Sequence, residues 1–177
     1  MAHRVYVPVW SPLIRILHWT LAASVLIALF TGHDGGSLHE AAGYVALGCV
    51  IVRVALGFVG ATHARFSDFL FGPKEVLAYA RDFIRGRAPR FMGHNPLGGW
   101  MIVALLCASF LASASGVLFI TEAYWGDEFV GWLHDASGTL IVALAVFHVL
   151  GVAAASWSHG ENLIAAMITG RKLQEPR

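Results

Sequence analysis

Four of the nine histidines lie inside or at the mouths of long apolar stretches, namely His18, His39, His134 and His148. An ionisable side chain is costly in such a stretch unless it faces the protein interior and has a partner there. His134 and His148 are fourteen residues apart in one stretch, WLHDASGTLIVALAVFHVLG. On an α-helix this spacing places both imidazoles on nearly the same face, about 21 Å apart along the axis. One helix would therefore offer two imidazole ligands at two depths.

The elements that position these histidines are predicted to be membrane-spanning helices. The 177 residues are 57% hydrophobic and 13% charged, with a mean hydropathy of +0.65. A helix of about 20 largely apolar residues crosses a bilayer core, and four stretches meet this requirement: residues 13–31, 38–59, 97–120 and 130–157. We expect an all-α, integral membrane four-helix bundle that forms a single domain over residues 1–177. The net charge of +1 gives no indication of nucleic-acid binding.

The distribution of charge predicts how the chain is oriented. We assign all twelve Lys and Arg residues to one side of the membrane, at the chain ends and around residues 61–96. The other two connections, residues 32–37 and 121–131, have no Lys or Arg and contain Asp34, Glu122, Asp127 and Glu128. The positive-inside rule then places both termini and the long middle loop in the cytoplasm. The N-terminal stretch lacks a small-residue cleavage site, so we expect the first span to be retained.

Two short helices are predicted outside the spans. After the segment FGP, apolar residues from Val76 to Ile84 recur at helical spacing, opposite charged residues such as Lys74 and Arg81. This pattern favours a helix that lies flat on the inner membrane surface, although a short helix in solvent would share it. A second apolar stripe predicts another such helix near residues 162–169.

The cysteines and the remaining histidines carry weaker signals. Cys49 and Cys107 fall in the middle of predicted spans, and we interpret both as small core residues without a disulfide. A CxxCH segment is absent, so a covalently attached c-type haem is not indicated. Five histidines fall in predicted loops or tails and are interpreted as solvated or turn residues: His3, His33, His63, His94 and His159.

The depths of the four span histidines predict two metal sites. His18 and His148 match in depth near the cytoplasmic side, and His39 and His134 match near the outer side. A zinc or copper site would require further ligands, and the spans hold no carboxylate or thiol cluster at matching depth. A haem requires only two axial ligands, because the porphyrin supplies the other four. We therefore predict two bis-histidine haem groups, an arrangement typical of electron transfer rather than oxygen binding.

Small residues accompany each predicted ligand on its own helix face. Gly43 follows His39 by four residues, and Gly138 follows His134 by four. Such residues would leave room for a flat macrocycle, and Ala22 and Gly151 stand in corresponding places after the other two histidines. Close packing of membrane helices also uses small residues, so this alternative stays open.

Few side chains are available for the haem propionates. Arg53 lies fourteen residues after His39, on a similar face but toward the cytoplasmic half, and could pair with an inner propionate. It could equally reach a lipid headgroup, and Arg15 is a weaker candidate of the same kind. No Lys or Arg is available for the outer haem, where backbone groups, water, Ser37 or Ser137 would serve.

At these residues the chain resembles the bacterial cytochrome b561 family, which is related to the cytochrome b subunits of nickel-iron hydrogenases. The matching segments are RILHW at residues 15–19, LHEAAGYVALGCVIVRVALGFVG at 38–60, HARFSDF at 63–69, GHNPLGG at 93–99, and WLHDASGTLIVALAVFHVLG at 132–151. The resemblance implies a four-helix di-haem membrane cytochrome with ligands at His18, His39, His134 and His148.

The resemblance also implies electron exchange between membrane ubiquinone or menaquinone and a partner, such as a periplasmic cytochrome c or a redox enzyme subunit. Some members of the family instead oxidise superoxide and pass the electron to ubiquinone. The acidic outer connections favour a basic cytochrome c over an anionic substrate. For the quinone we consider Arg53, His94 and Asn95 at the cytoplasmic edge. A homodimer and a histidine-based transporter are also considered, although no acidic residue lies deep in a span.

Overall fold

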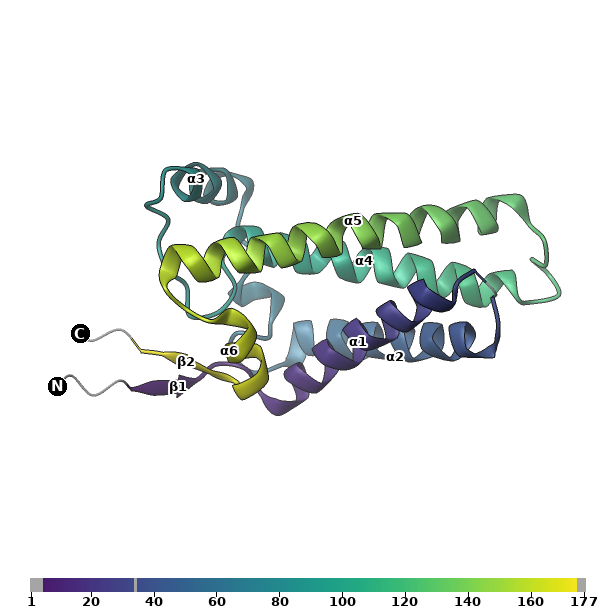
Figure 1. The fold of residues 1–177 in the computed structure, drawn as a ribbon, viewed down its shortest axis with the longest axis horizontal. Helices are drawn as coiled ribbons and strands as arrows, with labels where there is room; N and C mark the ends of the chain where they lie inside the picture. The colour runs from purple at the N-terminus through teal and green to yellow at the C-terminus, as the bar shows by residue number, and fades with distance from the viewer. Residues whose placement is uncertain (1–4, 34, 175–177) are drawn as a thin grey trace. The chain divides into compact units, whose positions relative to one another are not determined.

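Four long helices form most of the chain (Figure 1). The structure is a computed structural model that describes residues 5–33 and 35–174, so His3, Arg4, Asp34 and Arg177 lie outside the described residues. The long helices are α1 (Pro12–Thr31), α2 (Ser37–Val59), α4 (Pro96–Phe119) and α5 (Glu128–His159). Each is long and apolar enough to cross a membrane. They confirm the four predicted spans, with ends that differ by at most two residues.

Many large apolar side chains on the four long helices are exposed. In α1 and in α5, only 11% of the residues in an apolar stretch of 18 residues are buried, and in α2 the corresponding share is 33%. Large side chains such as Phe30, Phe58 and Phe147 are therefore exposed. Contiguous exposed apolar surface of this kind suits contact with lipid rather than water.

Short elements connect and flank the long helices. They are β1 (Tyr6–Pro8), the 3-10 helix η1 (Phe66–Asp68), α3 (Pro73–Ile84), α6 (Leu163–Thr169) and β2 (Arg171–Leu173). Both predicted short helices are present: Pro73 stands in the first turn of α3, and Asn162 caps α6 by accepting a 2.8 Å hydrogen bond from the N–H of Ala165. The two strands correct the all-α prediction. Strands of three residues are too short to show a two-residue alternation in the sequence.

The described chain divides into two compact units, each of which receives segments from all four long helices. Residues 1–15, 56–102 and 147–177 form what we name the basic unit, because it contains eleven of the twelve Lys and Arg residues and five acids. Residues 16–55 and 103–146 form the acidic unit, with six acids and the single cation Arg53. This division matches the charge asymmetry in the sequence. A single domain over residues 1–177 stays a prediction.

Pairing of the two end segments organises the basic unit. Strand β1 lies antiparallel to β2, with Tyr6 opposite Leu173 (Figure 1). Gly170 precedes β2 with a left-handed φ of 79°, and a Cβ there would lie 2.7 Å from the carbonyl oxygen of Trp10, so glycine suits this position. The paired strands hold the two end segments of the described chain next to each other.

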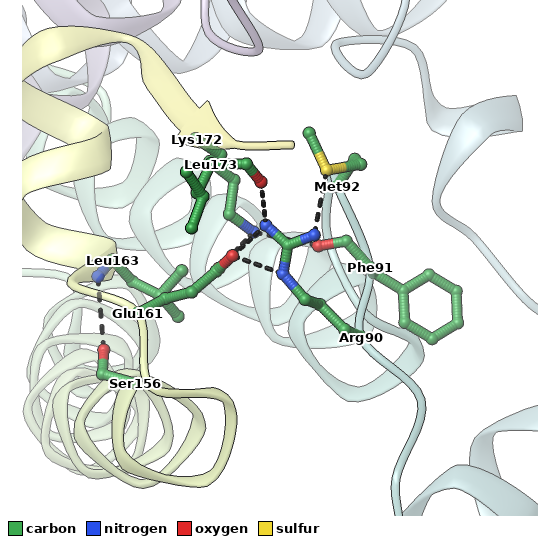
Figure 2. Close-up of polar contacts among 8 residues, drawn as sticks. All are labelled: Arg90, Phe91, Met92, Ser156, Glu161, Leu163, Lys172 and Leu173. Carbon is green, nitrogen blue, oxygen red and sulfur yellow. Dashed lines mark hydrogen bonds and ion pairs between the residues drawn. The ribbon is translucent and has the colours of Figure 1, made fainter. Parts of the chain in front are cut away.

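A buried ionic cluster holds three distant parts of the basic unit together (Figure 2). The guanidinium of Arg90 pairs with the carboxylate of Glu161 and donates a 2.5 Å hydrogen bond to the carbonyl of Leu173. Lys172 lies 3.2 Å from Glu161 and donates to the carbonyl of Phe91 at 2.9 Å. Burial lowers the pKa of Lys172, although the charge of Glu161 opposes that shift. The cluster contains two cations and one anion, so its stability depends on Glu161.

The acidic unit has a small apolar core formed by three of its helix segments. Ala108, Ala112 and Ile141 are buried together, with Val25 and Leu144 packed against them. The prediction for the cysteines is half wrong: both are free, but Cys49 is buried and Cys107 is exposed on α4. Apolar composition alone does not separate a core-facing residue from a lipid-facing one, because both are apolar in a membrane helix.

Candidate functional site

The structure brings two of the four predicted ligands together within the acidic unit. His39 lies in the first turn of α2, and His134 lies in the second turn of α5. Their ring centroids are 5.8 Å apart, and their ring planes are inclined by 75°. Both side chains are partly buried. Two imidazoles from different helices therefore face one shared space.

Each of these imidazoles is held by a backbone carbonyl. Nδ1 of His39 lies 2.9 Å from the carbonyl oxygen of Ala28 in α1. Nδ1 of His134 lies 2.8 Å from the carbonyl oxygen of Ala112 in α4. A carbonyl oxygen can only accept a hydrogen bond, so Nδ1 carries the proton and Nε2 keeps its lone pair. This is the tautomer that a metal-bound histidine adopts, with its other N–H donated to a carbonyl.

The separation of the two rings suits a single metal ion between them. Bonds from a first-row metal to an imidazole nitrogen are about 2 Å long, so two rings that share one ion have centroids roughly 6 Å apart. Within residues 5–33 and 35–174, no group of three or more His, Cys, Asp or Glu residues could hold a metal ion. Two histidines alone leave four positions of an octahedral iron open, which is the number that a porphyrin supplies.

Open space adjoins the glycine that follows each histidine by four residues. A Cβ added at Gly43 or at Gly138 would meet no atom within 4 Å. Each glycine stands one helical turn after its histidine. The histidine pair and the space beside it thus fit a flat macrocycle that carries an iron.

The other two predicted ligands fall in different units. His18 belongs to the acidic unit, where its ring meets that of Trp19 edge-on at 5.1 Å. His148 belongs to the basic unit. Helix α5 is continuous from Glu128 to His159, so the fourteen-residue spacing between His134 and His148 spans about 21 Å of helix. The pairing of His18 with His148 stays a prediction.

A family comparison identifies the class of protein to which this site belongs. The family model of the prokaryotic cytochrome b561 proteins matches residues 9–170. The chain belongs to the prokaryotic cytochrome b561 family. A b-type cytochrome carries haem b, and the family indicates electron transfer at a membrane.

Similar proteins agree with this assignment. A protein of Azotobacter chroococcum mcd 1, described as a probable Ni/Fe-hydrogenase B-type cytochrome subunit, is 24% identical over 215 residues, which cover 93% of this chain and 88% of that protein. A protein of Rhizobium leguminosarum bv. viciae with the same description is 24% identical over 216 residues, covering 96% and 90%. No solved structure matches the chain.

The residues predicted to meet propionates have different surroundings in this cytochrome b561. Arg53 is buried in α2, with 8% of its surface exposed, and belongs to the acidic unit. Arg15 belongs to the basic unit, where its guanidinium donates to the carbonyl of Ile168. Ser137 is buried, whereas Ser37 is exposed. A role for any of them beside a propionate stays a prediction.

The segment GHNPLGG, considered for the quinone, has clear structural roles in the basic unit. The side-chain oxygen of Asn95 accepts a 2.8 Å hydrogen bond from the N–H of Gly98 and so caps α4. A Cβ at Gly99 would lie 2.3 Å from the carbonyl oxygen of Phe69. The ring of His94 lies 4.5 Å from that of Trp10 and 5.0 Å from that of Phe69, rather than in open solvent. Loop geometry thus accounts for Asn95 and Gly99.

The carbonyls that accept hydrogen bonds from the two imidazoles were not predicted from the sequence. They belong to Ala28 and Ala112, each followed four residues later by a glycine. The signal for them is an internal similarity between IALFTG at residues 27–32 and LASASG at residues 111–116. In each segment a hydroxyl, that of Thr31 or Ser115, donates to the carbonyl four residues earlier. The two histidines also lie in similar segments, LHEAAG at residues 38–43 and LHDASG at residues 133–138.

A bulky side chain at Gly138 should exclude the outer haem. Replacing Gly138 with leucine would fill the space beside His134, so we expect the haem content per chain to fall by about half, measured as the pyridine haemochrome. Gly48→Leu is the matched control, because Gly48 also has open space around it but lies on the opposite face of α2 from His39. Equal haem content in the two variants would contradict the assignment of this space.

Proposed function

We propose that this cytochrome b561 binds two b haems, one between His39 and His134 and one between His18 and His148, and transfers electrons across the membrane. The observation that carries the proposal is the Nδ1 contact of each outer imidazole with a carbonyl, which leaves both Nε2 atoms available to one iron. Haem b held in this way supplies a reversible one-electron iron couple.

The side chains around the outer pair serve this role by binding, positioning and excluding water. His39 and His134 would hold the iron between them and would leave it no open position where oxygen could bind. The carbonyls of Ala28 and Ala112 restrain rotation of the rings. The apolar core of Ala108, Ala112 and Ile141 lies in the same unit, and an apolar shell of this kind would limit the access of solvent to the site.

We place the basic unit at the cytoplasmic face of a bacterial inner membrane, with both termini on that side. Support comes from its eleven Lys and Arg residues and from helix α3. Leu77 and Ile84, which we predicted to lie opposite Lys74 and Arg81, are instead 73% and 86% exposed on the same face as these cations. A face that mixes exposed apolar side chains with cations suits an inner membrane surface, where lipid tails and anionic headgroups meet.

The partner is proposed to be a redox protein that docks on the acidic outer connection. The similar proteins are described as hydrogenase cytochrome subunits, which supports a redox enzyme subunit or a cytochrome c as the partner and the membrane quinone pool as the other reactant. The connection exposes Glu122, Asp127 and Glu128 together with the rings of Tyr124 and Trp125. These charges attract a basic protein and repel superoxide.

The test uses the purified protein in lipid nanodiscs that contain ubiquinone. We expect rapid electron exchange with a basic, soluble cytochrome c, measured by stopped-flow absorbance, and a fall of about tenfold or more in that rate when Glu122, Asp127 and Glu128 are replaced by glutamine. The control is Glu75→Gln, in the basic unit. Superoxide added as its potassium salt should react slowly. Fast reaction with superoxide, and a cytochrome c rate that the triple variant leaves unchanged, would overturn the docking proposal.

A further inference from the structure

Two glycines lie against the imidazoles of the outer pair: Gly116 on α4, and Gly32 directly after the end of α1. A Cβ at Gly116 would lie 3.0 Å from Cε1 and 3.1 Å from Nδ1 of His134. A Cβ at Gly32 would lie 3.5 Å from Cε1 and 3.6 Å from Nδ1 of His39. Each glycine is four residues after the alanine whose carbonyl accepts the histidine hydrogen bond, and so stands directly above that carbonyl on the helix surface.

The absence of a side chain at Gly116 allows the short contact between His134 and Ala112. A carbon at 3.0 to 3.1 Å from the ring would be closer than van der Waals contact allows. The ring would have to move away from α4, and the 2.8 Å hydrogen bond from Nδ1 to the carbonyl of Ala112 would lengthen. At Gly32 the distances to the ring are ordinary contacts, so an added methyl group would press on His39 less, although it would lie 3.1 Å from the carbonyl oxygen of Ala28 that accepts from Nδ1 of His39.

The hydrogen bond at Nδ1 has an electronic consequence as well as a geometric one. Donation of the Nδ1 proton to a carbonyl increases the basicity of Nε2. A more basic nitrogen stabilises the ferric form of a bound iron over the ferrous form and so lowers the reduction potential. Outer hydrogen-bond partners of this kind typically change metal affinity by about 10- to 100-fold.

We propose that Gly116, and to a smaller degree Gly32, are positioning residues that set the reduction potential of the outer haem by letting each axial imidazole reach a helix carbonyl. This inference rests on the proposed function. Ser115 also contacts the carbonyl of Ala112, and we expect it to raise the reduction potential, which is the opposite of the effect of the hydrogen bond from His134. Its hydroxyl lies 2.6 Å from the carbonyl oxygen of Leu111 and 3.1 Å from that of Ala112, so part of its donation falls on the oxygen that also accepts from Nδ1 of His134.

The experiment is a redox titration of the purified variants, followed by visible absorbance. Gly116→Ala should retain two haems per chain and raise one midpoint potential by about 59 mV, which corresponds to a tenfold change in the ferric-to-ferrous affinity ratio. Ser115→Ala, which adds no atoms, should lower the same potential by about 18 mV, corresponding to a twofold change. Gly32→Ala should produce a smaller rise than Gly116→Ala. Gly48→Ala, at an exposed and open position, should shift neither potential.

Two results would overturn this inference while leaving the proposed function intact. One is a Gly116→Ala protein that keeps both haems and both wild-type potentials. The other applies if Gly116→Ala fails to fold or loses its haem: a Ser115→Ala protein whose potentials are unchanged or raised would then refute the role of the Ala112 carbonyl. A wild-type protein that binds no haem would instead contradict the proposed function itself.

Discussion

Replacing His134 with alanine should remove one of two haems from each chain and leave the other in place. The outer site would lose one axial ligand, and the remaining imidazole of His39 would hold the iron far less tightly. The site formed by His18 and His148 is assigned to other residues and should keep its haem. We expect the haem content to fall from about two to about one per chain, with one of two midpoint potentials absent from the redox titration.

The matched control for this variant is His33→Ala. His33 is exposed in the turn after α1 and belongs to the same unit as His134. That protein should keep both haems and both potentials. A His134→Ala protein with the wild-type haem content would show that His134 is not an axial ligand, whereas loss of both haems would show that the two sites do not form independently.

Replacing Glu161 with glutamine should destabilise the basic unit more than any exposed charge replacement would. The variant removes the carboxylate that pairs with both Arg90 and Lys172, whose side chains are 15% and 5% exposed. Removing one partner of a buried ion pair typically costs about 3 kcal/mol. Hydrogen exchange of the β2 amides, measured by mass spectrometry, should therefore accelerate by roughly 100-fold.

The pH dependence of this loss provides an independent check. Burial lowers the pKa of Lys172 from its usual 10.5, so the folded state binds its proton less tightly than the unfolded state does. Stability then rises as the pH increases through the lowered pKa toward 10.5. The effect of Glu161→Gln should accordingly shrink at alkaline pH, once exchange rates are corrected for their intrinsic pH dependence.

Asp82→Asn is the control for Glu161→Gln. Asp82 pairs with Arg87 at 3.2 Å, but the two side chains are 31% and 61% exposed. An exposed pair of this kind typically contributes about 1 kcal/mol or less, so exchange of the β2 amides should stay near the wild-type rate. If Glu161→Gln had no larger effect than this control, the ionic cluster would not stabilise the basic unit.

The long helices could be predicted from the sequence because a bilayer imposes a length and a composition on each span. The helix α3 could be predicted because Val76, Tyr79 and Phe83 repeat at helical spacing. The strands β1 and β2 could not, since each has three residues and pairs with a segment at the other end of the chain. The ionic cluster could not be predicted either, because Arg90 is far in sequence from Glu161 and Lys172.

The candidate site likewise has one part that could be predicted from the sequence and one part that could not. The types and spacing of His39 and His134 were sufficient to predict that they meet, because helix geometry converts residue number into depth. The contacts of their Nδ1 atoms depend on how closely two helix backbones approach, which hydrophobic periodicity does not encode. The glycines at residues 32 and 116 permit that approach, and only the similarity between IALFTG and LASASG indicates it in the sequence.

The central claim is that four imidazoles hold two haems in this cytochrome b561. The most direct test is the haem content per chain of the wild-type protein and of a His134→Ala, His148→Ala double variant, both expressed with ample haem and measured as the pyridine haemochrome. The account predicts about two haems per chain in the wild type and essentially none in the double variant. A colourless wild-type protein, or a double variant that retains its haem, would contradict it.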